Sequence, residues 1–403
     1  MKATGVVVEH NPFHNGHAYH VQQARKVTGA DIVIAVMSGN FLQRGEPALV
    51  DKWTRAKMSL SSGVDIVVEL PYRFATASAT EFAQGAIHLA NELKCDSFVF
   101  GSEHGEIEDF ITTYHLIATN REYYNSQIKH SLSQGKSYPM ALQDAFQSLH
   151  PHSETSVDLA QPNNILGYHY VEAAQGKPIQ PVTIQRIGAG YHDFIEEGQT
   201  IASATGIRHS LFKTMSIPGD HVPAATYRLL NEWYNTYQQF ASWEQFWPTL
   251  RYAILSKTPD QLREHAEVTE GIEFAIHKHA KTATSYQEFM QLLKSKRYTW
   301  TRLQRMMTHI YTGFLESQRT KEMPDAVRLL GMTSAGQAYL NHRKKDFELP
   351  LVSRLASSDS LFLAHDTRSS DVYYLGYSSK QLHNQVGQEY KKLPLRIELL
   401  PVK

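Results

Sequence analysis

Short apolar runs that alternate with amphipathic stretches limit the possible folds of this chain most strongly. The strand-like runs of the first half are Ala3–Glu9, Asp31–Met37, Asp65–Leu70, Ser97–Phe100 and Val182–Ile187. Stretches with helical spacing lie between them. Strands that alternate with helices build βαβ units with a parallel sheet. The sequence therefore predicts an α/β, Rossmann-like fold with a ligand site beyond the carboxyl ends of its strands.

The character of the chain changes after residue 215. Prolines and a glycine at 218–223 indicate a break, and Ala224–Arg343 has almost wholly helical periodicity. The C-terminal part holds three short strand-like runs, Leu361–Ala364, Val372–Tyr377 and Leu395–Leu399. We therefore expect a catalytic domain at residues 1–215 and a mainly helical domain with a few strands at residues 216–403.

Composition excludes several classes of protein. Lys and Arg total 40, as do Asp and Glu, so the zero net charge rules out a uniformly basic, histone-like protein. The single cysteine, Cys95, excludes an internal disulfide framework or a multi-cysteine metal site and is typical of a reducing compartment. No apolar run approaches the roughly 20 residues that span a bilayer. We therefore expect a cytoplasmic protein without membrane contact; the sequence does not indicate its oligomeric state.

The strongest local signal is His14-Asn15-Gly16-His17, directly after the first predicted strand. A turn from strand to helix leaves backbone N–H groups unpaired at the helix N-terminus, and these attract phosphate. Gly16 lets a nucleotide approach the backbone closely. The two imidazoles can donate hydrogen bonds to oxygens that gain charge during attack at an α-phosphorus. The motif therefore predicts a nucleotide site in which His14 and His17 are catalytic.

A metal site and a purely structural role are the alternatives for these histidines. His10, His14, His17 and His20 have helical spacings, and zinc takes three such ligands. The proline and the glycine between them interrupt any helix that would align all four. No H-E-x-x-H pattern is present. We therefore expect no protein-bound metal, while capping or packing by His14 and His17 stays open at this level.

A second signal, Ser203-Ala204-Thr205-Gly206-Ile207-Arg208, follows the fifth predicted strand. The hydroxyls of Ser203 and Thr205 suit phosphate oxygens, and the Arg208 guanidinium suits a leaving pyrophosphate. Alone, such a cluster is an ordinary helix N-cap. Together with the H-x-G-H motif of the same predicted sheet, it indicates a second polyphosphate contact, with Arg208 as a third catalytic residue.

A basic, aromatic stretch in the second half indicates contact with RNA. Phe289–Leu315 contains no Asp or Glu, and Tyr298 and Trp300 stand among its cations. Positive charge with exposed rings suits a phosphate backbone and unstacked bases; a solvated helix face with core aromatics is the alternative. The predicted RNA-binding residues are Lys294, Lys296, Arg297, Arg302 and Arg305, and Lys52, Arg55 and Lys57 could extend the same surface near the nucleotide site.

The H-x-G-H motif with the later S-x-T-x-I-R pattern resembles the nucleotidyltransferase superfamily of HUP-type α/β folds. Longer strings are more specific. Glu9–His17, Ser38–Ala48 with Asp51-Lys52-Trp53, and Gly63–Pro71 resemble the bacterial tRNA(Met) cytidine acetate ligase family. The similarity covers most of the chain, because it continues through Phe100–Glu103, Pro162–Gly167, Arg186–Asp193 and Arg297–Arg305.

This resemblance implies that ATP and acetate form acetyl-adenylate and pyrophosphate, and that the acetyl group passes to N4 of the wobble cytidine of elongator tRNA(Met). Mg²⁺ would bind through the ATP phosphates, because the sequence shows no carboxylate cage for it. The ATP contacts implied by the resemblance are Val7, Val8, Glu9, His10, Asn11, Pro12, Phe13, His14, Asn15, Gly16, His17, Ala18, Tyr19, His20, Gly101, Asn163, Arg186 and Ile187.

Two other functions share parts of this pattern. A small-molecule adenylyltransferase uses the same H-x-G-H and hydroxyl/arginine motifs, but it usually needs only the first domain. A non-enzymatic RNA-binding protein with a relic nucleotide fold is the other alternative, and the intact pair His14 and His17 with Arg208 argues against it.

Overall fold

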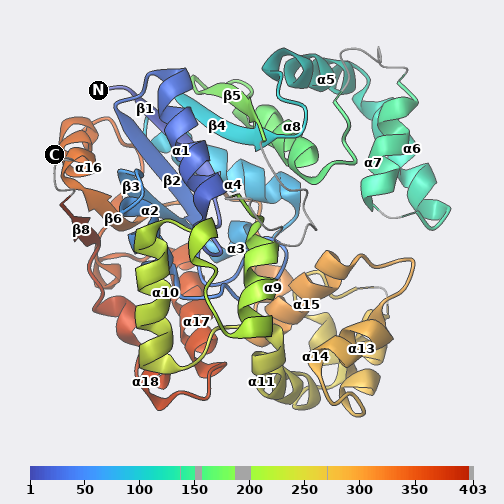
Figure 1. The fold of residues 1–403 in the computed structure, drawn as a ribbon. Helices are drawn as coiled ribbons and strands as arrows, with labels where there is room; N and C mark the ends of the chain where they lie inside the picture. Colours follow the sequence, from blue (N-terminus) through green and yellow to red (C-terminus); the bar gives the residue numbers. More distant parts are fainter. Residues whose placement is uncertain (137, 150–156, 187–200, 270, 399–403) are drawn as a thin grey trace.

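One mixed sheet forms the centre of the molecule (Figure 1). The computed structural model describes residues 1–403 except 137, 150–156, 187–200, 270 and 399–403. In this part of the chain eight strands have the order β5-β4-β1-β2-β3-β6-β7, and β8 pairs with β6. The strands are β1 (Ala3–Val8), β2 (Ile32–Ser38), β3 (Ile66–Leu70), β4 (Ser97–Ser102), β5 (Gln180–Gln185), β6 (Val327–Thr333), β7 (Leu351–Val352) and β8 (Leu395–Ile397).

The first five strands are all parallel, which confirms the predicted α/β class. Thr4 of β1 aligns with Val33 of β2 on one side and with Ser97 of β4 on the other. β2 and β3 are buried along their whole length, as expected for parallel strands with both faces covered. The strand order reverses at β1, so a ligand site is expected beyond the carboxyl ends of β1 and β4.

Helices cover the sheet and extend from it in two groups. In Figure 1, α5 to α7 project at one side, and α11, α13, α14 and α15 gather at another. The helices of the first half are α1 (Asn15–Thr28), α2 (Lys52–Leu60), α3 (Tyr72–Ala75), α4 (Ala79–Glu92), α5 (Ile107–Thr119), α6 (Arg121–Ser133), α7 (Tyr138–Gln147), α8 (Pro162–Ala174) and α9 (Ala204–Thr214). Those of the second half are α10 (Ala224–Tyr237), α11 (Trp243–Leu255), α12 (Pro259–Arg263), α13 (Ile272–Ala280), α14 (Tyr286–Leu293), α15 (Trp300–Thr312), α16 (Ser334–Arg343), α17 (Leu361–Leu375) and α18 (Lys380–His383).

The C-terminal part differs from its predicted strands. Leu361–Ala364 and Val372–Tyr377 were expected as strands, but α17 contains the first run and most of the second. The hydroxyl of Ser360 accepts a hydrogen bond from the Leu363 N–H and starts this helix. Short apolar runs do not distinguish strand from helix, which explains the error. The run that begins at Leu395 is a strand, β8.

The second half of the chain also completes the sheet of the first half. β6 lies within a stretch expected to be helical, yet it is fully buried and pairs antiparallel with β3. An aromatic core joins both halves as well, because the ring of Phe41 packs against those of Trp243, Tyr311 and Tyr373. The assignment of catalysis to residues 1–215 and of tRNA binding to residues 216–403 therefore stays a prediction about function within one connected core.

Lys52 and Arg55 are buried, so their predicted place on an RNA-binding surface is wrong. Lys52 Nζ lies 2.8 Å from both carboxylate oxygens of Glu69 and 3.1 Å from Glu389 Oε2. Arg55 donates hydrogen bonds to the backbone carbonyl oxygens of Val50, of Glu9 and of Ser38 at the end of β2. Local sequence did not reveal these partners, because Glu389 lies at the other end of the chain.

Replacing Lys52 with methionine is expected to reduce the free energy of unfolding by about 3–5 kcal/mol, because Glu69 and Glu389 would stay buried without their cation. Lys57→Met is the matched control, since Lys57 lies half-buried on the same helix. Denaturant-induced unfolding measures both variants. Equal stability of the two would contradict a stabilising ion cluster.

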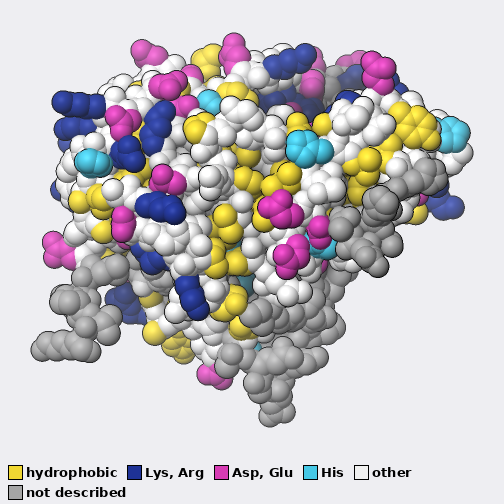
Figure 2. All heavy atoms as spheres, turned by 90° about the horizontal axis from the view of Figure 1, so that it is seen from above, with side chains coloured by type: hydrophobic (Ala, Val, Ile, Leu, Met, Phe, Trp, Pro, Cys, Tyr) yellow, Lys and Arg dark blue, Asp and Glu magenta, His cyan; other side chains and the backbone are white. Residues whose placement is uncertain are grey.

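The surface carries charges of both signs. In Figure 2, Lys and Arg side chains lie among Asp and Glu side chains, so neither sign dominates the face in view. Within the described ranges, every helix is too short or too polar to cross a bilayer.

Candidate active site

A cavity of about 560 Å³ opens where the strand order reverses. The ends of β1, β4 and β5 and the N-termini of α1 and α9 contribute to its lining. The loop at residues 42–46 and the first part of α15 also line it. Its volume lies in the range of ligand sites, roughly 300–1,000 Å³. The two sequence motifs, nearly 200 residues apart, therefore meet in one cavity of nucleotide size.

His14 and His17 are held by hydrogen bonds to the backbone at the start of α1. His14 is the N-cap, and its Nδ1 accepts from the Gly16 N–H at 3.0 Å. His17 Nδ1 accepts from the His14 N–H at 3.3 Å. A neutral imidazole carries its proton on the nitrogen that does not accept. Both rings therefore carry an Nε2–H donor, so capping and a catalytic role are compatible.

Both rings are neutral at neutral pH. Burial, with the positive charges of Arg186 and Arg208, lowers the pKa of His14 to about 3. Burial, with the neighbouring rings of His14 and His10, also lowers the pKa of His17 well below its usual value. The His14 and His17 rings stack with centroids 3.7 Å apart. The site thus presents two neutral donors to a ligand, and a Cβ on Gly16 would press against His14.

The other two histidines of this segment do not complete a metal site. His10 Nδ1 lies 2.7 Å from Ser59 Oγ, whose own proton is donated to the Arg55 carbonyl. Among the residues that the structure describes, no three His, Cys, Asp or Glu side chains are grouped so that they could hold a metal ion. The zinc alternative therefore gains no support from the geometry.

Arginines from two elements border the histidines. Arg208 Nη1 donates to the Asn11 carbonyl at 2.9 Å, and its Nη2 lies 3.3 Å from Glu46 Oε2. Arg186 directly follows β5, with Nη1 3.5 Å from Asn163 Oδ1. Two guanidinium groups and two neutral donors suit a polyphosphate.

Most of the predicted site residues line the cavity. Those that do so are Val7, Val8, Glu9, His10, Asn11, His14, Gly16, His17, Tyr19, His20, Gly101, Asn163, Arg186, Ser203, Thr205 and Arg208. Pro12, Phe13, Asn15 and Ala18 are not part of its lining. Phe13 lies in the hydrophobic core, and Asn15 donates to the Asp220 carbonyl. Ile187 lies outside the described residues.

Sequence reasoning missed the loop that forms another wall. Gln43, Arg44 and Glu46 line the cavity, together with Thr301 of α15. Ser38–Ala48 carries the family resemblance, but no role had been inferred for it. Its position immediately after the second strand was the available signal, because such segments lie at the site edge of a parallel sheet.

The predicted RNA-binding residues do not share one environment. Lys294, Lys296 and Arg297 are exposed, whereas Arg302 is half-buried. Arg305 lines the cavity and forms an ion pair with Glu267. Tyr298 was expected to be exposed, but it is buried because it packs in the core around α15, and Trp300 alone of the two rings is exposed.

Comparison with known proteins gives this site its context. The sequence model of the HIGH Nucleotidyl Transferase family matches residues 1–389. The tRNA(Met) cytidine acetate ligase of Lysinibacillus sphaericus is 54% identical over 402 residues, which cover 98% of this chain and 100% of the relative. The chain belongs to this ligase family. The Bacillus subtilis member is 45% identical over 407 residues, with 99% of this chain and 98% of that protein covered.

Solved structures agree with the assignment to the family. Thermotoga maritima TmcAL bound with alpha-thio ATP matches with a TM-score of 0.89 at 30% identity, covering 99% of this chain and 100% of that one. The apo form I of the same protein matches with a TM-score of 0.91 at 32% identity and the same coverage. The family resemblance and the fold class inferred from the sequence are therefore confirmed.

Proposed function

We propose that this protein activates acetate with ATP and transfers the acetyl group to N4 of the wobble cytidine of elongator tRNA(Met). One observation carries this proposal most directly. In a chain of this ligase family, the neutral side chains of His14 and His17 and the guanidinium groups of Arg186 and Arg208 line one cavity, where the strand order of the sheet reverses.

In the first half-reaction, an acetate oxygen forms a bond to the α-phosphorus of ATP, and the bond from that phosphorus to pyrophosphate breaks. The Nε2–H groups of His14 and His17 would donate to oxygens that gain charge in this step. Arg208 would bind the leaving pyrophosphate through its guanidinium. Positioning and charge stabilisation suffice, so no covalent enzyme intermediate is needed.

In the second half-reaction, cytidine N4 bonds to the acetyl carbonyl carbon while the bond from that carbon to the AMP phosphate breaks. AMP leaves, and N4 releases one proton. The cavity suits this step because its lining includes Thr301 and Arg305 of the second half. A small-molecule adenylyltransferase would need only the first half, so this lining favours the larger RNA substrate.

Mg²⁺ would enter with ATP and neutralise phosphate charge. Two carboxylates line the cavity, and both already have partners: Glu9 accepts a hydrogen bond from the Gln43 N–H, and Glu46 forms an ion pair with Arg208. The ion would therefore be coordinated mainly by phosphate oxygens. We place the reaction in the cytoplasm, where ATP and tRNA are available.

The test uses purified protein with ATP, a panel of small carboxylates, and tRNA. Acetate should give pyrophosphate, AMP and N4-acetylcytidine in tRNA(Met), and removal of magnesium should stop the reaction whereas removal of zinc should not. AMP attached stably to a small-molecule acceptor would instead support the adenylyltransferase. RNA binding without ATP turnover would support the non-enzymatic alternative.

A further inference from the structure

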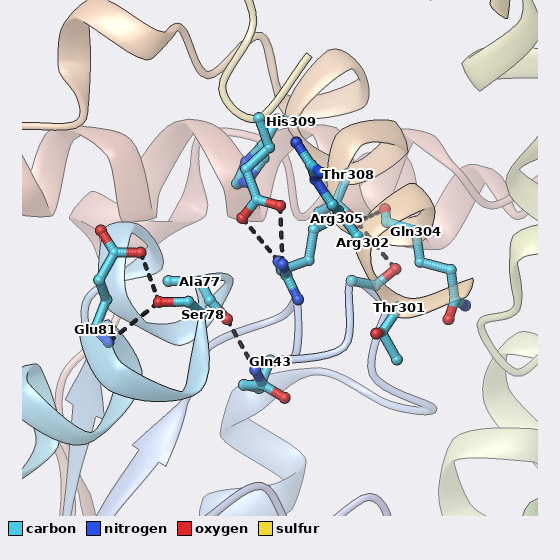
Figure 3. A network of polar contacts seen from close by, with 12 residues as sticks. Gln43, Ala77, Ser78, Glu81, Thr301, Arg302, Gln304, Arg305, Thr308 and His309 are labelled. Carbon is cyan, nitrogen blue, oxygen red and sulfur yellow. Dashed lines mark hydrogen bonds and ion pairs between the residues drawn. The ribbon is translucent and has the colours of Figure 1, made fainter. Parts of the chain in front are cut away.

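The cavity has a second polar wall that the adenylation chemistry does not use. Gln43 belongs to the loop at residues 42–46, and Thr301 and Arg305 belong to α15; all three line the cavity. Figure 3 shows these side chains around one space. The wall thus joins a segment of the first half to α15, which lies in the basic, aromatic stretch Phe289–Leu315.

Arg305 offers donors in a fixed direction. Its Nε and Nη2 lie 2.8 and 2.9 Å from the two carboxylate oxygens of Glu267. The two side chains are only 12% and 9% exposed, so this bidentate pair is held firmly. Nη1 has no hydrogen-bond partner in the part of the chain described here, and it points between Gln43 and Thr301 (Figure 3).

Gln43 offers an acceptor in the same wall. Its Nε2 donates to the Ala77 carbonyl at 2.8 Å, which fixes the orientation of the amide. Its backbone N–H donates to Glu9 Oε1 at 2.7 Å. The amide oxygen, Oε1, accepts no hydrogen bond from any described residue. The wall therefore presents one acceptor beside the donors of Arg305.

Close packing fixes the two groups relative to each other. The Gly45 carbonyl accepts from Trp243 Nε1 at 2.7 Å and from Thr308 Oγ1 at 3.0 Å. Gly45 has φ +76°, and a Cβ there would lie 2.4 Å from the backbone nitrogen of Arg305. The loop and α15 are thus in direct contact, which is the arrangement that a preorganised recognition site requires.

We propose that Gln43 and Arg305 bind the Watson–Crick edge of the cytosine that receives the acetyl group; this inference rests on the proposed function. Cytosine has acceptors at N3 and O2 and a donor at its N4 amino group. Arg305 Nη1 donates to the ring acceptors, and Gln43 Oε1 accepts from one N4–H. The other N4 hydrogen is the proton released on acetylation.

The same two groups exclude uracil. Uracil has a donor at N3 and an acceptor at position 4, so Arg305 would face a donor and Gln43 Oε1 would face an acceptor. Bases in RNA are read in this way when they are unstacked and enter a pocket. Contacts with the RNA backbone, by contrast, add affinity without base discrimination.

Gln43→Leu tests the acceptor at nearly constant volume, and Gln291→Leu, at an exposed position of α14, is its matched control. We expect wild-type protein and the control to bind tRNA(Met) about tenfold or more tightly than the same tRNA with uridine at the acceptor position. In Gln43→Leu this preference should fall below about twofold, and acetyl transfer should slow about 10²-fold. Acetate-dependent ATP–pyrophosphate exchange should stay within about twofold of wild type.

Arg305 needs a paired design, because its removal would leave Glu267 buried without a cation. The double variant Arg305→Met/Glu267→Gln avoids that charge, and Glu267→Gln alone is its control. The double variant should lose the preference for cytidine. Arg302→Gln, one helical turn away on α15, should weaken binding of both tRNAs equally.

The outcomes separate this subsite from the proposed function. Absence of exchange and of tRNA acetylation in the wild type would overturn the proposed function and, with it, the subsite. An active wild type whose cytidine preference and transfer rate persist in Gln43→Leu and in the double variant would overturn the subsite alone. Equal losses of exchange and transfer in Gln43→Leu would also overturn it, because Gln43 would then serve ATP.

Discussion

Replacing His17 with alanine is expected to slow acetate-dependent ATP–pyrophosphate exchange about 10²-fold or more, because one neutral Nε2–H donor would be lost from the α-phosphate. His14→Ala should have an effect of at least this size, since the His14 side chain also caps α1 and its ring stacks on that of His17. Exchange measures the first half-reaction without RNA, so a tRNA-binding defect cannot imitate the result.

His14→Asn separates catalysis from folding. Asparagine is a favourable N-cap, so this variant should keep the thermal stability of the wild type and still lose exchange activity. His88→Ala is a control outside the cavity, because His88 lies on α4 with its Nε2 near the Pro324 carbonyl. Near-normal exchange in either His14 or His17 variant would refute the phosphate role. Tightly held stoichiometric zinc would restore the metal-site alternative.

Arg208→Ala is expected to slow adenylation strongly and to leave tRNA binding unchanged. Its guanidinium lies in the cavity, held by the Asn11 carbonyl and by Glu46. Loss of a charged donor to a polyphosphate should reduce exchange by about 10²-fold. Folding should survive, because the Glu46 side chain is 31% exposed and can be solvated without its partner. Exchange and tRNA-binding assays on one preparation check both statements.

Arg208→Ala is to be compared with a variant that removes positive charge from the second half of the chain, Lys294→Ala/Lys296→Ala/Arg297→Ala. These three residues are exposed, so they should meet RNA phosphates, and each lost contact should reduce the log–log salt slope by about one unit. Exchange should remain intact. Because Arg208→Ala also removes positive charge, a general electrostatic effect would weaken tRNA binding in both variants. Unchanged affinity and salt slope in the triple variant would mean that RNA docks elsewhere.

Short-range chemistry made much of the first half predictable. Apolar runs and the helical stretches between them identified the five parallel strands. Hydrophobic periodicity and turn-forming residues are local signals, because they depend only on residues a few positions apart. The same reasoning placed the H-x-G-H segment and the Ser203 cap at the carboxyl edge of the sheet. These motifs can form one nucleotide site, because the segments that follow parallel strands lie together at the carboxyl edge of the sheet.

Long-range packing decided what those patterns leave open. β6 became a strand because β3 offered an unpaired edge, and α17 formed where local runs suggested strands. Lys52 and Arg305 are both cations in helical stretches, but their surroundings differ. Lys52 is buried in an ion pair with Glu389, whereas Arg305 lines the cavity in an ion pair with Glu267. The sequence by itself determined the parallel sheet and its phosphate-facing motifs. Only the tertiary structure decided which charged side chains are exposed, because burial and ion pairing depend on partners that the chain brings from far away.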